Sequence, residues 1–405
     1  MEREKGHNSK VLVFLLLFNS LLVISPLFSW LLPFSEVYAV VTFVILVFYL
    51  IFFNIKLNIR YLLVAFVLIF GSLVPSLYWL ELRYFFYPSF FLVALLLVTI
   101  CGRNEIAKFV DLSTNIILLL LAASVVGFIL AKLGFDYTLK FKNPDGRWNY
   151  LYYTTLTNYV RGDFIRPSAI FDEPGTFSFV ICLTAFFRFC LGRDFKLTWI
   201  ILFLGFITFS LAHLIFCTIF LFAERFNAKR ISFFLGLLLS AFLIFTFTGF
   251  SSTISDKLLG RLEITEEGTV KGDNRTVLMG NALSEIEKKN EAVLVGLDPD
   301  CLFNVPVCKE EYPLMGANPV TPLVFQGLFV SWPYYLLIIL SCLSLFVHGR
   351  SGLAFFAVGL LFLQRPYLML AGYSLLGVLA VQLVYANKLK IGYSGHSSHS
   401  SEGAR

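Results

Sequence analysis

Long runs of apolar residues, separated by short polar segments, dominate the sequence. Each run approaches the roughly 20 residues that a helix needs to cross the hydrocarbon core of a bilayer. Charged residues make up only 14% of the chain, whereas soluble proteins contain about a quarter. This pattern excludes an ordinary soluble domain and predicts an all-α polytopic membrane protein. The clearest apolar runs lie near residues 11–32, 37–53, 61–80, 84–101, 109–131, 174–191, 231–250, 326–347 and 368–386.

Two further stretches decide the number of spans. Residues 197–223 form either one long helix or two short helices broken at Ser210, and residues 352–363 are short. If the chain turns back at Ser210 and 352–363 crosses, there are about twelve transmembrane helices with both termini cytoplasmic, in keeping with the positive-inside rule. The inner side then holds Arg3, Lys5, Lys10, Lys56, Arg60, Arg103, Lys108, Arg188, Arg193, Lys196, Arg225, Lys229, Arg230, Arg350, Lys388 and Lys390.

The short outer loops of this arrangement hold Arg83 and Arg365. A single helix over 197–223 would instead export Arg225, Lys229 and Arg230, so the broken version is favoured. The formal charge of +6 therefore belongs to cytoplasmic loops and gives no reason to expect a nucleic-acid partner. The predicted divisions are helices 1–5 in 1–131, a first long outer loop in 132–173, helices 6–9 in 174–250, a second long outer loop in 251–325, helices 10–12 in 326–390 and a disordered tail in 391–405.

Most sequence signatures of cofactor and metal chemistry are absent. The chain has no Walker loop, no His-Glu-x-x-His, no Gly-x-Ser-x-Gly and no dinucleotide glycine fingerprint. We therefore expect no cofactor and no metal. His213 lies at the proposed break, where a buried polar residue either marks a functional site or caps the broken helix.

Cys301 and Cys308 lie in the second long loop, whereas the other cysteines lie in or beside apolar spans. If this loop faces an oxidising compartment such as a periplasm, we predict that the two cysteines form a disulfide. The alternative is two unpaired thiols. The loop contains no His or further Cys, which makes a zinc site less favoured.

The end of the first loop is the best candidate for chemistry. Asp172 and Glu173 precede Pro174, which suits the first turn of a helix, so both carboxylates should lie at the positive end of the helix dipole. Arg161 and Arg166 are close in sequence and could hold an anion beside a carboxylate. The simpler alternatives are that the acids only cap the helix, or that Arg166 only pairs with one of them.

The two long loops differ in composition. Aromatic residues fill 132–173, where they serve either as an interfacial belt or as stacking surfaces for sugar rings. In 251–325, apolar residues at 278, 282, 283 and 286 predict an amphipathic helix that starts near Asn274 or Arg275.

Three motifs stand out in these segments: Arg166-Pro-Ser-Ala-Ile-Phe-Asp-Glu-Pro-Gly175, Arg275 followed by Gly296, and Asn318 ahead of Gln326-Gly327. With these motifs the chain resembles the superfamily of O-antigen polymerases and ligases, which are polytopic inner-membrane enzymes of bacterial surface polysaccharide synthesis. The chain departs from the ligase pattern at Ala317-Asn318-Pro319, where ligases typically carry a His, so the polymerase branch is favoured.

The resemblance implies a metal-independent glycosyltransferase. It would polymerise oligosaccharide repeat units carried on undecaprenyl pyrophosphate, without a cofactor, in the bacterial inner membrane. The implied partners are the lipid-linked donor and acceptor, membrane lipids, and a chain-length regulator and flippase. A ligase that transfers glycan to lipid A core and a lipid-linked oligosaccharide flippase are the alternatives. The implied catalytic residues are Arg166, Glu173 and Arg275, and the implied substrate-binding residues are Arg147, Arg161, Asp172 and Asn318.

Overall fold

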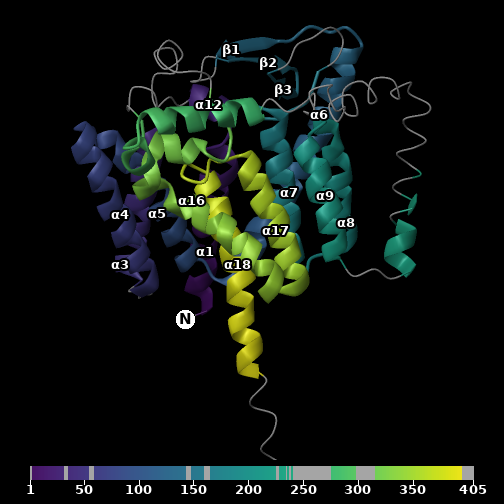
Figure 1. Cartoon of the computed structure of the whole chain (residues 1–405). Coiled ribbons are helices and arrows are strands. Elements are labelled where there is room, and N and C mark those ends of the chain that lie inside the picture. The colour runs from purple at the N-terminus through teal and green to yellow at the C-terminus, as the bar shows by residue number, and fades with distance from the viewer. Residues whose placement is uncertain are drawn as a thin grey trace, which may run out of the picture.

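Figure 1 shows the computed structural model of the chain as a bundle of helices, with a small β-sheet and a crosswise helix at one end. The structure describes residues 2–31, 35–53, 59–142, 147–158, 165–224, 228–233, 235, 236, 239, 275–297 and 315–394. The first half comprises α1 (Glu2–Leu17), the π-helix η1 (Phe18–Leu22), α2 (Pro26–Leu31), α3 (Ser35–Phe52), α4 (Ile59–Trp79), the 3₁₀ turn η2 (Leu82–Phe85), α5 (Phe86–Ile100) and α6 (Arg103–Lys132).

The second half of the bundle begins where the sequence predicts, at Pro174. Its apolar helices near 174–191, 352–363 and 368–386 are found, and so is the amphipathic helix beginning at Arg275. The elements are α7 (Pro174–Cys190), α8 (Phe195–Gly205), the 3₁₀ turn η3 (Phe206–Thr208), α9 (Leu211–Ala223), α12 (Arg275–Lys288), α13 (Ala292–Val295), α16 (Thr321–Val347), α17 (Gly349–Gln364) and α18 (Tyr373–Ser394).

The predicted single helix over 11–32 is wrong. Asn19 and Ser20 turn their side chains back onto the carbonyl groups of Leu15 and Leu16, at 2.9 and 2.7 Å, and the chain adopts a π-helix there. Such back-bonding bends helices because it competes with the regular backbone ladder. Pro26 then starts a separate short helix, as proline does at a first helical position.

The predicted break in 197–223 is confirmed. Phe209 adopts a left-handed backbone conformation with φ 48°, and α8 and α9 fold back on each other as a hairpin. Ring contacts fix the antiparallel pairing, because Phe206 lies 4.9 Å from His213 and Trp199 lies 5.9 Å from Phe220. His213 is fully buried, and its Nε2 lies 2.7 Å from the carbonyl oxygen of Leu202 in α8.

The expectation of an all-α chain also needs correction. The first long loop folds into a three-stranded antiparallel sheet of β1 (Leu139–Lys142), β2 (Trp148–Tyr152) and β3 (Thr155–Thr157). Aromatic and β-branched residues in β2 and β3 favour such strands. The sheet covers the C-terminal end of α6, where Thr154 donates a hydrogen bond to the carbonyl of Ala123.

Helix α7 is the centre of the bundle. It packs against α6, α8, α9, α17 and α18, and most of its side chains are buried. Helices with apolar residues on all sides are found in the core of large proteins or in membrane spans. The N-terminal end of α7 points toward the sheet and α12 (Figure 1). Residues at this end are therefore held in place by the buried central helix.

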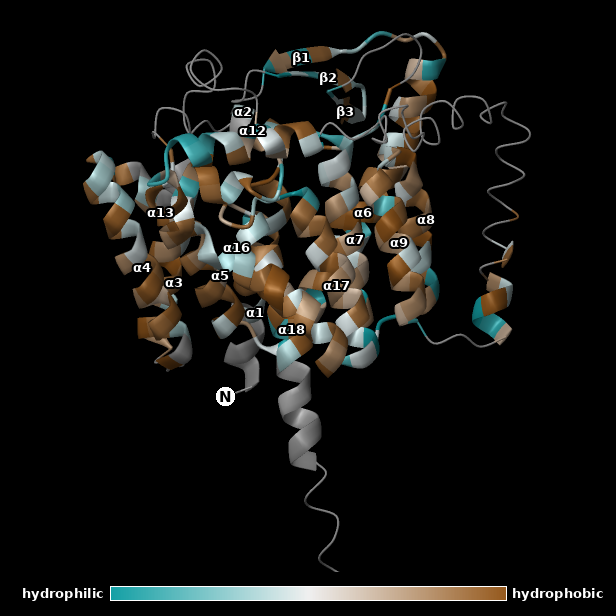
Figure 2. Ribbon diagram, in the orientation of Figure 1, coloured by the Kyte–Doolittle hydropathy of each residue, from teal (hydrophilic) through white to brown (hydrophobic). Residues whose placement is uncertain are grey.

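Three described helices, α4 from Tyr61, α6 and α16, are long and apolar enough to cross a membrane by length and composition. The other apolar helices are shorter, between 10 and 17 residues. Hydrophobic residues predominate along the helices of the bundle, and hydrophilic residues gather on α12 and near the ends of the helices (Figure 2). On α3 and α4, Phe48, Phe66 and Phe70 are each more than half exposed, which is consistent with a surface that faces lipid.

Helix α16 is broken at Gly327, where φ is 67°. The short helix α13 packs against this break, and the backbone N–H of Leu297 donates to the carbonyl oxygen of Val324 at 2.7 Å. A Cβ atom at Gly327 would lie 2.6 Å from the backbone nitrogen of Gly296, so there is no room for a side chain. The second long loop is thereby fixed to α16.

We expect Gly327→Ala to destabilise the protein by at least about 1 kcal/mol, because alanine meets backbone atoms and must also adopt a positive φ. Gly280→Ala is the matched control, since Gly280 lies in α12 with open space around its Cα. Thermal unfolding of the purified proteins in detergent should show a lower midpoint for Gly327→Ala and an unchanged or higher midpoint for Gly280→Ala. Equal midpoints would contradict the close contact.

Candidate functional site

Asp172 and Glu173 lie at the N-terminal end of α7, as predicted. Glu173 is the last residue before the helix, its backbone is extended, and Pro174 occupies the first turn. Asp172 Oδ1 accepts a hydrogen bond of 2.7 Å from the hydroxyl of Thr176. Both side chains are about three-quarters buried, at the positive end of the helix dipole.

Arg147 pairs with both carboxylates. Its guanidinium contacts Glu173 and lies 3.4 Å from Asp172. The sheet positions this arginine, since Arg147 directly precedes β2. The strand β3 is in turn tied to the segment before α7, because Leu156 N–H donates to the carbonyl oxygen of Ala169 at 2.7 Å.

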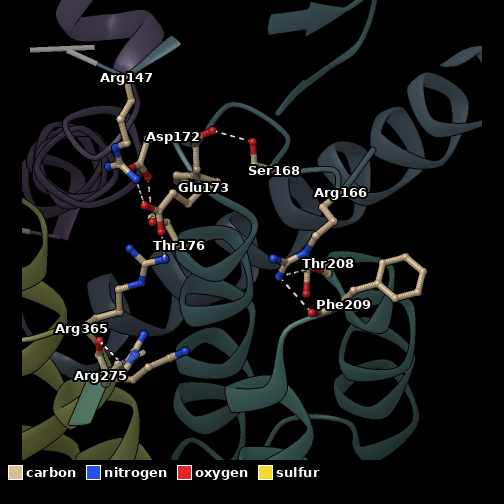
Figure 3. A network of polar contacts seen from close by, with 12 residues as sticks. Arg147, Arg166, Ser168, Asp172, Glu173, Thr176, Thr208, Phe209, Arg275 and Arg365 are labelled. Carbon is tan, nitrogen blue, oxygen red and sulfur yellow. Dashed lines mark hydrogen bonds and ion pairs between the residues drawn. The ribbon is translucent and has the colours of Figure 1, made fainter. Parts of the chain in front are cut away.

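Arg365 is the site residue that the sequence analysis did not select. It follows α17 at the same end of the bundle, and its side chain, only 6% exposed, forms an ion pair with Glu173. Figure 3 shows Arg147 and Arg365 reaching the carboxylates from different parts of the chain. The available signal was its position, because Arg365 is one of the basic residues in short loops on the predicted outer side.

Arg275, the first residue of α12, lies beside Arg365. Its Nη1 donates a hydrogen bond of 2.9 Å to the backbone carbonyl of Gln364, the residue before Arg365. The contact joins the second long loop to the end of α17. Two of the arginines that the sequence indicated therefore lie at this site. Arg147 contacts the two carboxylates, and Arg275 lies beside Arg365 (Figure 3).

Arg166 points away from the carboxylates, toward the α8–α9 hairpin (Figure 3). Its Nε and Nη2 donate to the carbonyl oxygen of Thr208 at 3.2 and 3.1 Å, and Nη2 also donates to that of Phe209 at 2.9 Å. These carbonyl groups belong to the turn that reverses the chain. The planar guanidinium therefore fastens the first loop to the hairpin.

Asn318 is fully buried beside α12. Its Nδ2 donates to the carbonyl groups of Met315 and Leu278, at 2.8 and 3.3 Å, and its Oδ1 accepts from the N–H of Val320. Since Leu278 lies one turn after Arg275, Asn318 helps to position α12. The substrate-binding role that the resemblance implies for Asn318 stays a prediction.

The remaining selected residues, Arg161, Cys301 and Cys308, lie outside the described residues. Among the residues that are described, no three His, Cys, Asp or Glu side chains come together as metal ligands would. In β2, burial raises the pKa of the Tyr152 phenol, with a smaller contribution from Asp136.

The comparisons with known proteins return no match: no family model, no curated protein and no solved structure is similar to the chain. The site must therefore be interpreted from its own chemistry. Arg147 and Arg365 pair with Asp172 and Glu173, and Arg275 lies beside Arg365, so three guanidinium groups and two carboxylates gather at one end of an apolar bundle. Guanidinium groups bind phosphate and carboxylate oxygens through two parallel hydrogen bonds, and a carboxylate can accept a proton.

We expect Arg166→Lys to lower stability by about 1–3 kcal/mol, because an ammonium group cannot reproduce the fork that binds the Thr208 and Phe209 carbonyl groups. The measurement is thermal unfolding in detergent, with the surface pair Arg193–Asp111 supplying the control Arg193→Lys. A variant with wild-type stability but no activity would instead assign Arg166 to substrate binding.

Proposed function

We propose that this chain is a polymerase of lipid-linked oligosaccharide repeats. The observation that carries the proposal is the pairing of Arg147 and Arg365 with the carboxylates of Asp172 and Glu173, beside Arg275, at one end of an apolar helical bundle. A lipid-linked sugar pyrophosphate combines an apolar tail with a strongly anionic headgroup. Such a substrate needs cationic side chains at the surface of a membrane-embedded protein.

The proposed reaction is a glycosyl transfer. The hydroxyl oxygen of the acceptor sugar bonds to the anomeric carbon of the donor, and the bond from that carbon to the pyrophosphate oxygen breaks. Glu173 accepts the proton that the hydroxyl loses. The pyrophosphate leaves as an anion, and the arginines stabilise the charge that develops on its oxygens.

The sheet supplies a surface for the sugars. Trp148 and Tyr153 are each close to half exposed and lie in or beside β2, which directly follows Arg147. Lys140 lies 4.1 Å from the ring centroid of Trp148 and holds this side chain in place. Exposed aromatic faces next to an anion site suit an oligosaccharide attached to a pyrophosphate.

The proposal places the chain in the bacterial inner membrane with about twelve crossings, both termini in the cytoplasm and residues 132–173 and 251–325 outside. The arrangement of the bundle supports it, since the sheet and α12 lie at one end and the ends of α1 and α18 at the other (Figure 1). Flippase and chain-length regulator are the proposed partners.

Glu173→Gln and Arg275→Lys should each reduce polymer formation at least tenfold, with single repeat units accumulating, because the first removes the proton acceptor and the second weakens the α12 contact. Electrophoresis of the surface polysaccharide gives the chain lengths. Arg193→Lys should leave them unchanged. Wild-type chain lengths in both Glu173→Gln and Arg275→Lys would remove these residues from the mechanism.

Alkaline phosphatase fused after Gly272 should be active, because the proposed topology exports the second long loop. A fusion after Lys196 should be inactive, because this residue lies in a basic inner loop. An inactive phosphatase fusion at Gly272, together with an active cytoplasmic reporter at the same position, would show that the second long loop faces the cytoplasm and that the proposed topology is wrong.

A further inference from the structure

Arg365 differs from the other arginines of the site in its burial. Its side chain is 6% exposed, whereas that of Arg147 is 43% exposed. Within the part of the chain that the structure describes, the Arg365 Nε group is buried and has no hydrogen-bond partner. A buried N–H group without a partner costs free energy, and a charged one costs more, so such a group in a polar cluster indicates a ligand.

The protein leaves space for this guanidinium. Gly175, in the first turn of α7, faces Arg365, and a Cβ atom at this position would collide with the Nη2 atom. The guanidinium therefore lies against the backbone at the start of α7, close to the positive end of the helix dipole. An anion bound to Arg365 would be stabilised by the helix terminus as well as by the arginine.

The two carboxylate oxygens of Glu173 pair with different arginines. Its Oε2 atom accepts a hydrogen bond from Arg365, and its Oε1 atom accepts one from Arg147. Phosphate oxygens would bind the same N–H groups as these carboxylate oxygens, so the two anions compete. A diphosphate carries more charge and more acceptor oxygens than one carboxylate, and it can use the Arg365 Nε group as well. Displacement would also release Glu173 from its arginine partners.

We propose that Arg365 is the buried ligand of the substrate diphosphate and that Glu173 is the internal competitor which the diphosphate displaces. This inference rests on the proposed function, since it takes the lipid-linked diphosphate as the ligand. It makes Glu173 available as a proton acceptor only when the donor is bound. Glu173 therefore activates the acceptor hydroxyl only while the lipid-linked donor is bound.

The test measures binding of farnesyl diphosphate to the purified full-length chain in detergent, with farnesyl monophosphate and farnesol as comparisons. The diphosphate should bind most tightly and the alcohol most weakly. Arg365→Gln should weaken diphosphate binding at least about tenfold, since hydrogen bonds to a charged group are lost. Glu173→Gln should strengthen it several-fold because the competitor is neutral, and Arg193→Gln should change nothing.

Undiminished affinity in Arg365→Gln would overturn the proposal, and so would weaker binding by a folded Glu173→Gln protein. If Glu173→Gln does not fold, the Gly175→Ala variant tests the proposal instead. This substitution keeps every charge, and its Cβ atom displaces the Arg365 guanidinium. Its binding should be weaker than that of the wild type, and equal affinity would overturn the proposal.

The outcome is separate from that of the polymerase proposal. A chain that shows this binding pattern but joins no repeat units is a diphosphate-binding protein with a different reaction. If the Arg365→Gln variant polymerises normally, the polymerase proposal stands and the proposed role of Arg365 is wrong.

Discussion

The structure depends on the ion pairs around Glu173. Helix α7 is surrounded by five other helices, and its N-terminal end carries two carboxylates that are mostly buried. A carboxylate removed from water is costly unless it is paired, and removing one partner of a buried pair costs about 3–5 kcal/mol. Arg147 from the start of β2 and Arg365 from the end of α17 provide the pairing. The central helix thus determines where the sheet and the last helices must come together.

The parts of the fold that follow from local sequence were predictable. Pro174 after two acids located the start of α7, and the spacing of apolar residues located α12 from Arg275 onward. Basic residues after 223 favoured the hairpin of α8 and α9. Each of these inferences used neighbours within a few positions of the chain.

The parts that depend on distant contacts were not predictable. Arg365 reaches Glu173 across 192 positions, and nothing in Gln364-Arg365-Pro366 indicates that partner. Arg166 was selected because it is near Asp172 in sequence, yet its hydrogen bonds go to Thr208 and Phe209. The strands β1 to β3 were missed because aromatic residues beside a membrane suit an interfacial belt as well as a sheet.

The break in α16 has a consequence for the order in which the protein assembles. At Gly327 the helix ladder is interrupted, and the carbonyl of Val324 is satisfied by Leu297, which lies just after α13. In hydrocarbon, backbone groups without partners are tolerated only where protein covers them. The N-terminal part of α16 can therefore reach its final conformation only after α13 has packed against it. The last three helices therefore reach their final packing only after this contact between Leu297 and Val324 has formed.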